Sequence, residues 1–249
     1  MKYFIAKLFI KIDKFIHKNF DFLNLNKKGQ FGTNYEWIYR YLFDDLVHLS
    51  NKTFIEVGSR DAYDALGLIE KFNFSYGYIF EPSYSGIIKT IENLKHNRKF
   101  STRITIFPFG LGDKNGIENF YEYRHFTKND NVPNFGASNF NSSEDNDNLK
   151  YKVPIYELDN LNLDLSNNYL LAMDCEGSEL SVLKGAKNSI QNTKYICLET
   201  SLSAAKQIKY FLENLNFKLI DCDLENSNKG ELPKLDNLNI RFNLLFQKT

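Results

Sequence analysis

The spacing of hydrophobic residues along the chain changes at about Thr53. From there to Leu198, short apolar runs of strand length alternate with longer segments whose apolar residues recur at helical spacing. Such alternation is typical of βαβ units that build a mostly parallel sheet. The pattern therefore predicts an α/β fold.

Five parallel strands are predicted, at residues 54–57, 76–80, 104–109, 169–173 and 195–198. The predicted helices run to about residue 72 after the first strand and then cover 84–94, 178–190 and 204–215. Two further apolar runs, 217–222 and 240–246, are joined by a polar stretch without helical periodicity. We interpret them as an antiparallel pair, so the last strand of the sheet is reversed.

A polar stretch at residues 124–150 interrupts this alternation. It is rich in Asn, shows no periodicity and is longer than a structural connection needs. A stretch of this kind is typical of a lid, a substrate-binding loop or a disordered segment.

Two helices are predicted before the sheet, so residues 1–50 form an N-terminal extension to a domain at 51–249. In residues 1–20 the apolar side chains share one helical face and lysines occupy the other. We favour packing of this basic amphipathic helix on the domain or on a second subunit, as in a homo-oligomer, over contact with a membrane surface. The second helix covers about residues 37–49.

The composition narrows the range of partners. The 249 residues are enough for one sizeable domain, and 31 Lys and Arg balance 31 Asp and Glu, so no overall field attracts nucleic acid or an anionic membrane. Three dispersed cysteines indicate a reducing compartment. Lysines interrupt the N-terminal apolar residues before a signal peptide or membrane span is reached. We therefore expect a cytoplasmic protein with a small or neutral partner.

Acidic residues and glycines gather at the ends of the predicted strands. In parallel sheets ligands bind beyond the carboxyl ends of the strands. Glu56 and Gly58 end the first strand, where glycine allows close approach of a ligand to the backbone. Glu81 ends the second, placed to accept both hydroxyls of a ribose. Beyond the later strands lie Gly110, Gly112 and Asp113, then Asp174 with Glu176 and Glu179, and finally Glu199.

In their order and spacing, these motifs resemble those of the FkbM-type methyltransferases. That family shows an acid-x-Gly turn, a Phe-Glu-Pro strand end, a Gly-Asp turn and an Asp-x-Glu-Gly-x-Glu motif, which here begins at Asp174. The resemblance covers about residues 53–199. Where the family turn carries Asn and a second Gly, this chain has Arg60 and Ala62.

The resemblance implies S-adenosylmethionine as cofactor and O-methylation, often of sugar hydroxyls in glycans or glycosylated natural products. It also implies a Rossmann-like sheet of seven strands with helices on both faces and a reversed last strand. By resemblance and strand-end placement, Glu56 and Gly58 are expected at the methionine portion, Glu81 at the ribose and Asp113 near the adenine. The expected cofactor-binding set also includes Ser59, Pro82, Gly112 and Asp174. For Asp113, a simple turn between two strands is an equal alternative.

Asp174 is the first candidate for the base that takes the proton of an alcohol acceptor. The alternative is that Asp174 caps the following helix, with Glu176 and Glu179 complementing the helix dipole. Glu199 is expected to bind acceptor hydroxyls, and His125 is a further catalytic candidate in the long polar stretch. Asp174 and Glu199 would also suit Mg²⁺, but two carboxylates are too few to assign a metal site.

The sequence thus predicts an S-adenosylmethionine-dependent O-methyltransferase that acts on a hydroxyl of a sugar or surface-glycan precursor. A nicotinamide-linked oxidoreductase is one alternative, although its pyrophosphate normally requires a Gly-x-Gly-x-x-Gly turn. A catalytically silent binding protein of the same fold is the other.

Overall fold

A computed structural model describes residues 35–38, 41, 51–122, 138–140, 149–224, 229–233 and 240–249. The first predicted helix, His125 and nearly all of the polar stretch 124–150 lie outside these residues. Of the second predicted helix, the structure describes the 3-10 turn η2 (Glu36–Ile38) and Tyr41. The proposed boundary at residue 50 therefore stays a prediction.

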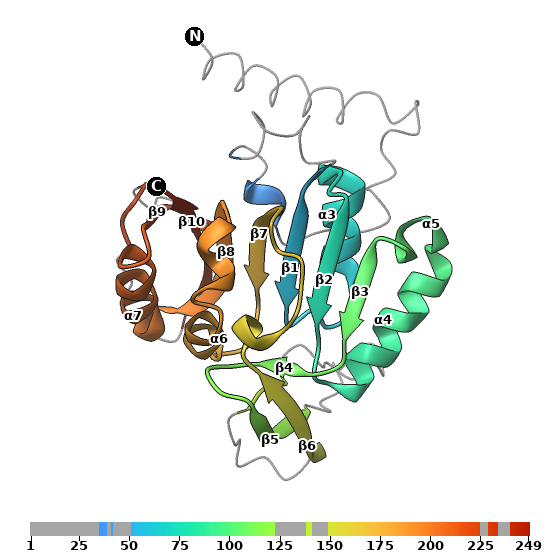
Figure 1. The fold of residues 1–249 in the computed structure, drawn as a ribbon. Coiled ribbons are helices and arrows are strands. Elements are labelled where there is room, and N and C mark those ends of the chain that lie inside the picture. Colours follow the sequence, from blue (N-terminus) through green and yellow to red (C-terminus); the bar gives the residue numbers. More distant parts are fainter. Residues whose placement is uncertain are drawn as a thin grey trace.

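Seven strands form the main sheet, in the order β3-β2-β1-β7-β8-β10-β9 (Figure 1). Their bounds are Thr53–Val57 (β1), Tyr76–Phe80 (β2), Ile104–Phe107 (β3), Asn168–Met173 (β7), Tyr195–Ser201 (β8), Phe217–Cys222 (β9) and Arg241–Lys248 (β10). The first five pair in parallel, whereas β10 runs antiparallel to both β8 and β9. The predicted seven-stranded sheet with a reversed last strand is confirmed.

Helices cover both faces of this sheet because successive strand residues alternate between two apolar cores. Leu170 and Ala172 of β7 pack in the core that includes α3 (Tyr63–Phe72). Leu171 and Met173 pack in the opposite core with α6 (Glu179–Gly185) and α7 (Leu202–Glu213). The remaining helical bounds are Tyr84–His96 (α4), Arg98–Ser101 (α5), Leu158–Asn160 (η5) and Ser189–Asn192 (η6). Within the described part of the chain, no helix is long and apolar enough to cross a membrane.

A second sheet, which the hydrophobic pattern did not predict, lies beyond the carboxyl ends of the parallel strands (Figure 1). It has the order β4-β6-β5, with β4 at Gly110–Leu111, β5 at Gly116–Glu122 and β6 at Leu149–Tyr156. The predicted third strand was therefore too long. It ends at Phe107, and the chain then turns into β4 of the second sheet.

The predicted single helix at 178–190 was also wrong, because α6 ends at Gly185 and a separate 3-10 turn follows. At Gly185 the helix passes against the chain that leaves β4. A Cβ atom there would lie 1.8 Å from the carbonyl oxygen of Gly112. The absence of a Cβ atom at Gly185 thus allows this close approach.

Candidate active site

An open cavity lies at the carboxyl ends of β1, β2 and β7. This is the point where the strand order reverses, since β2 lies on one side of β1 and β7 on the other. Five of the residues predicted from the sequence line it: Gly58, Ser59, Glu81, Pro82 and Asp174. The structure therefore brings the strand-end motifs together around one open cavity.

The turn after β1 adopts a conformation that only a few residue types favour. Gly58 has φ +80°, and a Cβ atom there would meet the carbonyl oxygen of Asp174 at 1.9 Å. Glycine thus lets the turn lie directly against the end of β7. Arg60 (φ 55°) and Ala62 (φ 62°) are also left-handed, although neither residue favours this region. These are the positions where the FkbM-type turn carries Asn and Gly.

Glu56 contacts this turn through Ser59 and does not itself line the cavity. Its side chain is 1% exposed, and it accepts a hydrogen bond of 2.7 Å from Ser59 Oγ. Burial raises the pKa of Glu56 well above its usual value, and the nearby Asp64 raises it further, against the opposing effect of the Ser59 hydrogen bond. Glu56 thus orients Ser59, which does line the cavity.

Backbone groups hold Glu81 at the end of β2. Its Oε2 accepts a hydrogen bond of 2.6 Å from the Arg60 amide, and its Oε1 accepts one of 2.7 Å from the Ser83 amide. Burial raises the pKa of Glu81, while hydrogen bonds from Ser83 and Arg60 lower it. Each carboxylate oxygen retains a lone pair after these contacts. Glu81 can therefore accept two further hydroxyl groups.

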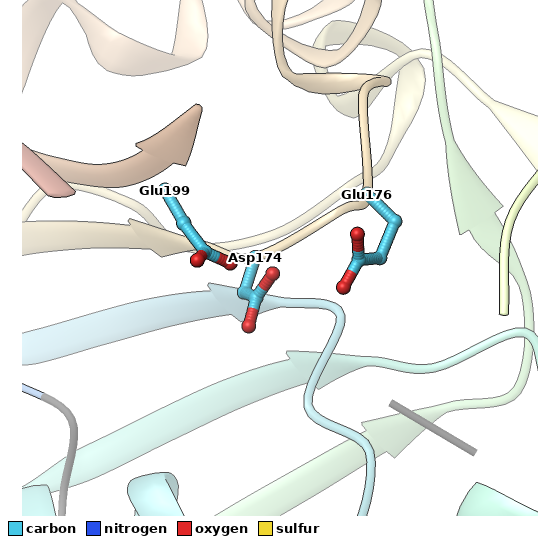
Figure 2. Close-up of side chains that lie close together, drawn as sticks. All are labelled: Asp174, Glu176 and Glu199. Carbon is cyan, nitrogen blue, oxygen red and sulfur yellow. The ribbon is translucent and has the colours of Figure 1, made fainter. Parts of the chain in front are cut away.

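Three carboxyl groups meet at the end of β7. Asp174, Glu176 and Glu199 each place an oxygen within 4.8 Å of the other two, and Figure 2 shows the three side chains turned toward one another. Glu199 comes from β8 and lies beside Asp174, but it does not line the cavity. The structure thus brings together Asp174 and Glu199, the two acids predicted to act on the acceptor, and of these Asp174 lines the cavity.

Arg241 of β10 lies among these acids. Its Nη1 is 2.8 Å from Glu176 Oε2, its Nε is 3.4 Å from Glu199 Oε2, and its Nη2 is 3.9 Å from Asp174 Oδ1. The Nη2 atom also lies 3.5 Å from Glu179 Oε1. One guanidinium therefore faces four carboxyl groups.

This environment changes the ionisation of Asp174. Burial, the charge of Glu199, a hydrogen bond with Glu199 and the charge of Glu176 together raise the pKa of Asp174 to about 8, whereas Arg241 lowers it. Burial also raises the pKa of Glu176, against the lowering effect of Arg241. A carboxyl group that titrates near neutral pH suits proton transfer.

Glu179 organises the loop between β7 and α6. It is 1% exposed, and its Oε1 accepts hydrogen bonds from the amides of Cys175 (3.3 Å) and Gly177 (3.0 Å). In this loop Glu176 (φ 50°) and Gly177 (φ 102°) are both left-handed. Glu179 therefore stabilises the strained backbone at Glu176, whose side chain lines the cavity.

The structure does not bring Gly112 and Asp113 to the cavity. Both line a neighbouring depression, and Asp113 lies in the turn between β4 and β5, where its amide hydrogen-bonds Ser181 Oγ at 3.1 Å. The alternative of a turn between two strands thus describes its position. A contact of these residues with the cofactor stays a prediction.

Sequence reasoning missed Arg241, Tyr35 and Asp64. Tyr35, just before η2, and Asp64, in the first turn of α3, both line the cavity. Arg241 begins a strand whose position beside β8 follows from the topology alone. Asp64 could have been predicted from its position just after the Gly58 turn, whereas no local pattern in the sequence marks Tyr35 or Arg241.

Comparisons with known proteins agree with this geometry. The family described as the methyltransferase FkbM domain matches residues 56–219, which is more than half of the chain. A crystal structure of methyltransferase FkbM from Methylobacillus flagellatus KT has a TM-score of 0.52 and 17% sequence identity. The similarity covers 79% of this chain and 44% of that one, so this chain spans less than half of its length.

Two other methyltransferases have similar structures at lower scores. TrmK of M. capricolum, solved with S-adenosyl-homocysteine, shares 10% identity at a TM-score of 0.45 over 82% of this chain and 67% of its own. Precorrin-6y C5,15-methyltransferase from Geobacter metallireducens GS-15 shares 12% identity at 0.45 over 89% and 95%. No curated protein matches the sequence.

The family match includes the Gly58 turn, the Glu81 strand end and the acidic motif that begins at Asp174. It confirms the predicted class of methyltransferase domain and gives no support to the oxidoreductase alternative. The chain belongs to the FkbM methyltransferase family.

Proposed function

We propose that this protein transfers a methyl group from S-adenosylmethionine to a hydroxyl of a sugar or surface-glycan precursor. The observation that carries the proposal is Asp174, a carboxyl group with a pKa of about 8 at the edge of the cavity that the Gly58 turn and Glu81 also line. A methyltransferase that acts on an alcohol needs such a proton acceptor beside its cofactor site.

The charge of the cavity lining supports S-adenosylmethionine as the cofactor. S-adenosylmethionine carries a positive sulfonium and an ammonium group, and the cavity lining includes four carboxyl groups, from Asp64, Glu81, Asp174 and Glu176. Glu81 has the free lone pairs that two ribose hydroxyls require. When bound, the cofactor supplies an electrophilic methyl group on sulfur.

The protein's own part in the reaction is to place the acceptor and to take its proton. An alcohol that becomes methylated loses a proton, and Asp174 is placed to accept it. Positioning of the acceptor oxygen supplies much of the rate in a displacement of this kind. Glu176 lines the cavity and can accept a hydrogen bond from a neighbouring hydroxyl of a polyol, whereas Glu199 lies beside Asp174 outside the cavity lining.

The charge of the site favours a neutral acceptor. Four carboxyl groups share the single guanidinium of Arg241 at the end of β7, so a phosphate at this edge would meet net repulsion. This supports the proposal of an uncharged sugar hydroxyl over a nucleic-acid acceptor.

Cytoplasmic location and self-association through the N-terminal residues remain part of the proposal. Cys175, Cys197 and Cys222 are all free thiols, which suits a reducing compartment.

Calorimetry with S-adenosylmethionine and S-adenosylhomocysteine tests the cofactor assignment. An isotopically labelled methyl donor then tests the acceptor, in a screen of neutral oligosaccharides, nucleotide sugars and transfer RNA. We expect binding of both cofactor forms and label on a neutral sugar hydroxyl. Absence of cofactor binding would overturn the proposal, and label on transfer RNA alone would overturn the acceptor class. Binding without transfer to any acceptor would favour a silent protein.

A further inference from the structure

We propose that Arg241, on the reversed strand β10, is a positioning residue that keeps Asp174 able to accept a proton. The inference rests on the proposed function of Asp174. Arg241 does not line the cavity, so it acts through the acids in front of it and not on a ligand. We therefore expect it to affect the chemistry of Asp174 more than the affinity for the cofactor.

The sheet topology places Arg241 where it can act. Strand β10 is inserted between β8 and β9, and Arg241 pairs in register with Ser201 at the carboxyl end of β8. From this position the guanidinium reaches acids from three other elements. They are Asp174 and Glu176 after β7, Glu179 at the start of α6, and Glu199 on β8.

Among the described residues that interact with Asp174, Arg241 supplies the positive charge. The carboxyl groups are Glu199 from β8 and Glu176 from the adjoining loop. Cys175 and Tyr35 also interact electrostatically with Asp174, and neither supplies positive charge. Glu179 lies behind the same guanidinium. Without Arg241, the remaining groups of this cluster all disfavour a negative charge on Asp174.

The contact between Arg241 and Asp174 is one of charge and not of hydrogen bonding. The two atoms that approach each other, Nη2 and Oδ1, are 3.9 Å apart. Both are buried, and neither has a hydrogen-bond partner among the residues that the structure describes. Arg241 therefore stabilises the carboxylate form without using the lone pairs that accept the proton.

The size of the effect follows from the distance. An opposite charge within about 4–6 Å lowers the pKa of a carboxyl group by about 1–3 units, and partial exposure of both side chains favours the lower end. In Arg241→Gln we expect the pKa of Asp174 to rise by about one unit. The deprotonated fraction at neutral pH would then fall by about tenfold.

The experiment compares Arg241→Gln, Arg241→Lys and the control Arg103→Gln. Arg103 donates a hydrogen bond of 3.0 Å to the Ser75 carbonyl, and it lies before the start of β3, at the other end of the sheet. Carboxyl carbon NMR of the free protein, with Asp174 identified by its loss in Asp174→Asn, gives its pKa directly. The pH dependence of methyl transfer is measured in parallel.

We expect the pKa of Asp174 to rise in Arg241→Gln, to rise less in Arg241→Lys and to stay constant in Arg103→Gln. The rate profile should shift toward higher pH by the same amount, with unchanged S-adenosylhomocysteine affinity. An unshifted pKa, or a rate loss that is equal at every pH, would overturn the inference. If Arg241→Gln does not fold, the same two measurements on Arg241→Lys, the pKa of Asp174 and the pH dependence of the rate, test the inference. Because NMR uses the free protein, a shifted pKa without methyl transfer would contradict the proposed function and not the role of Arg241 in Asp174 ionisation.

Discussion

The two sides of the site hold the carboxyl groups in and around the cavity in different ways. At the ends of β1 and β2, Glu56 accepts a hydrogen bond from Ser59, and Glu81 accepts two from backbone amides. At the ends of β7 and β8, Asp174 and Glu199 face each other and share the charge of Arg241. The first side fixes its acids by hydrogen bonds from the Ser59 hydroxyl and from backbone amides. The second side holds its acids by charges and by the hydrogen bond between Asp174 and Glu199.

This difference separates binding from proton transfer. A carboxylate held by backbone donors keeps its orientation, which suits recognition of two ribose hydroxyls by Glu81. A carboxyl group among other acids, with one cation nearby, takes up or releases its proton near neutral pH, which suits Asp174. The following changes test this division, from the largest expected effect to the smallest.

Asp174→Asn should reduce turnover by roughly 10²–10⁴-fold, because the amide keeps the shape of the side chain but cannot take the proton. Cofactor affinity should remain nearly unchanged. Steady-state kinetics, a cofactor titration and a melting curve of the same variant measure these effects. A modest loss shared between turnover and acceptor binding would indicate an orienting role. Near-normal turnover would leave only a structural role for Asp174.

Glu81→Ala should weaken S-adenosylmethionine and S-adenosylhomocysteine binding by about 1.5–3 kcal/mol, which is about 10- to 150-fold. The loss reflects hydrogen bonds from the ribose to a charged acceptor. Calorimetry measures it, with Glu122→Ala as the matched control. Glu122 is equally buried, but it does not line the cavity and instead accepts hydrogen bonds from Ser85 and Tyr151. Equal losses in the two variants would refute the ribose assignment.

The raised pKa of Asp174 also predicts a dependence of stability on pH. The folded protein binds this proton up to a pH of about 8, whereas an ordinary Asp releases it near 3.8, so ionisation at rising pH destabilises the fold between these values. Asp174→Asn removes this effect. The melting temperature of Asp174→Asn minus that of the wild type should therefore increase from pH 4 to pH 8 and then level off. A difference that does not change with pH would contradict the raised pKa.

Arg60→Gly should increase the free energy of unfolding by about 0.5–1 kcal/mol. A left-handed non-glycine residue costs about 1–2 kcal/mol, and the greater entropy of glycine in the unfolded chain offsets part of the gain. Urea denaturation measures the change. Arg98→Gly, at an exposed helical position in α5, is the control and should instead lose up to about 1 kcal/mol. Destabilisation of both variants would show that the Arg60 side chain outweighs its backbone strain.

Local sequence patterns predicted the strands of the main sheet and several residues that line the cavity. Strand periodicity located all seven strands of the main sheet because each is a short apolar run between polar turns. Motifs at the strand ends identified Gly58, Glu81 and Asp174, since parallel strands bring their carboxyl ends to one edge. The second sheet was missed because two of its strands flank a long polar stretch and pair across it.

What the sequence determined by itself is the set of acids and the glycine turn that a parallel sheet must gather at its carboxyl edge. Tertiary structure alone decided which positive charge lies among those acids, namely that of Arg241. Arg241 lies 42 residues beyond Glu199 in the chain, yet insertion of the reversed strand β10 beside β8 places their side chains 3.4 Å apart. No local pattern encodes this contact, because strand order arises from packing across the whole sheet and not from the residues of one strand.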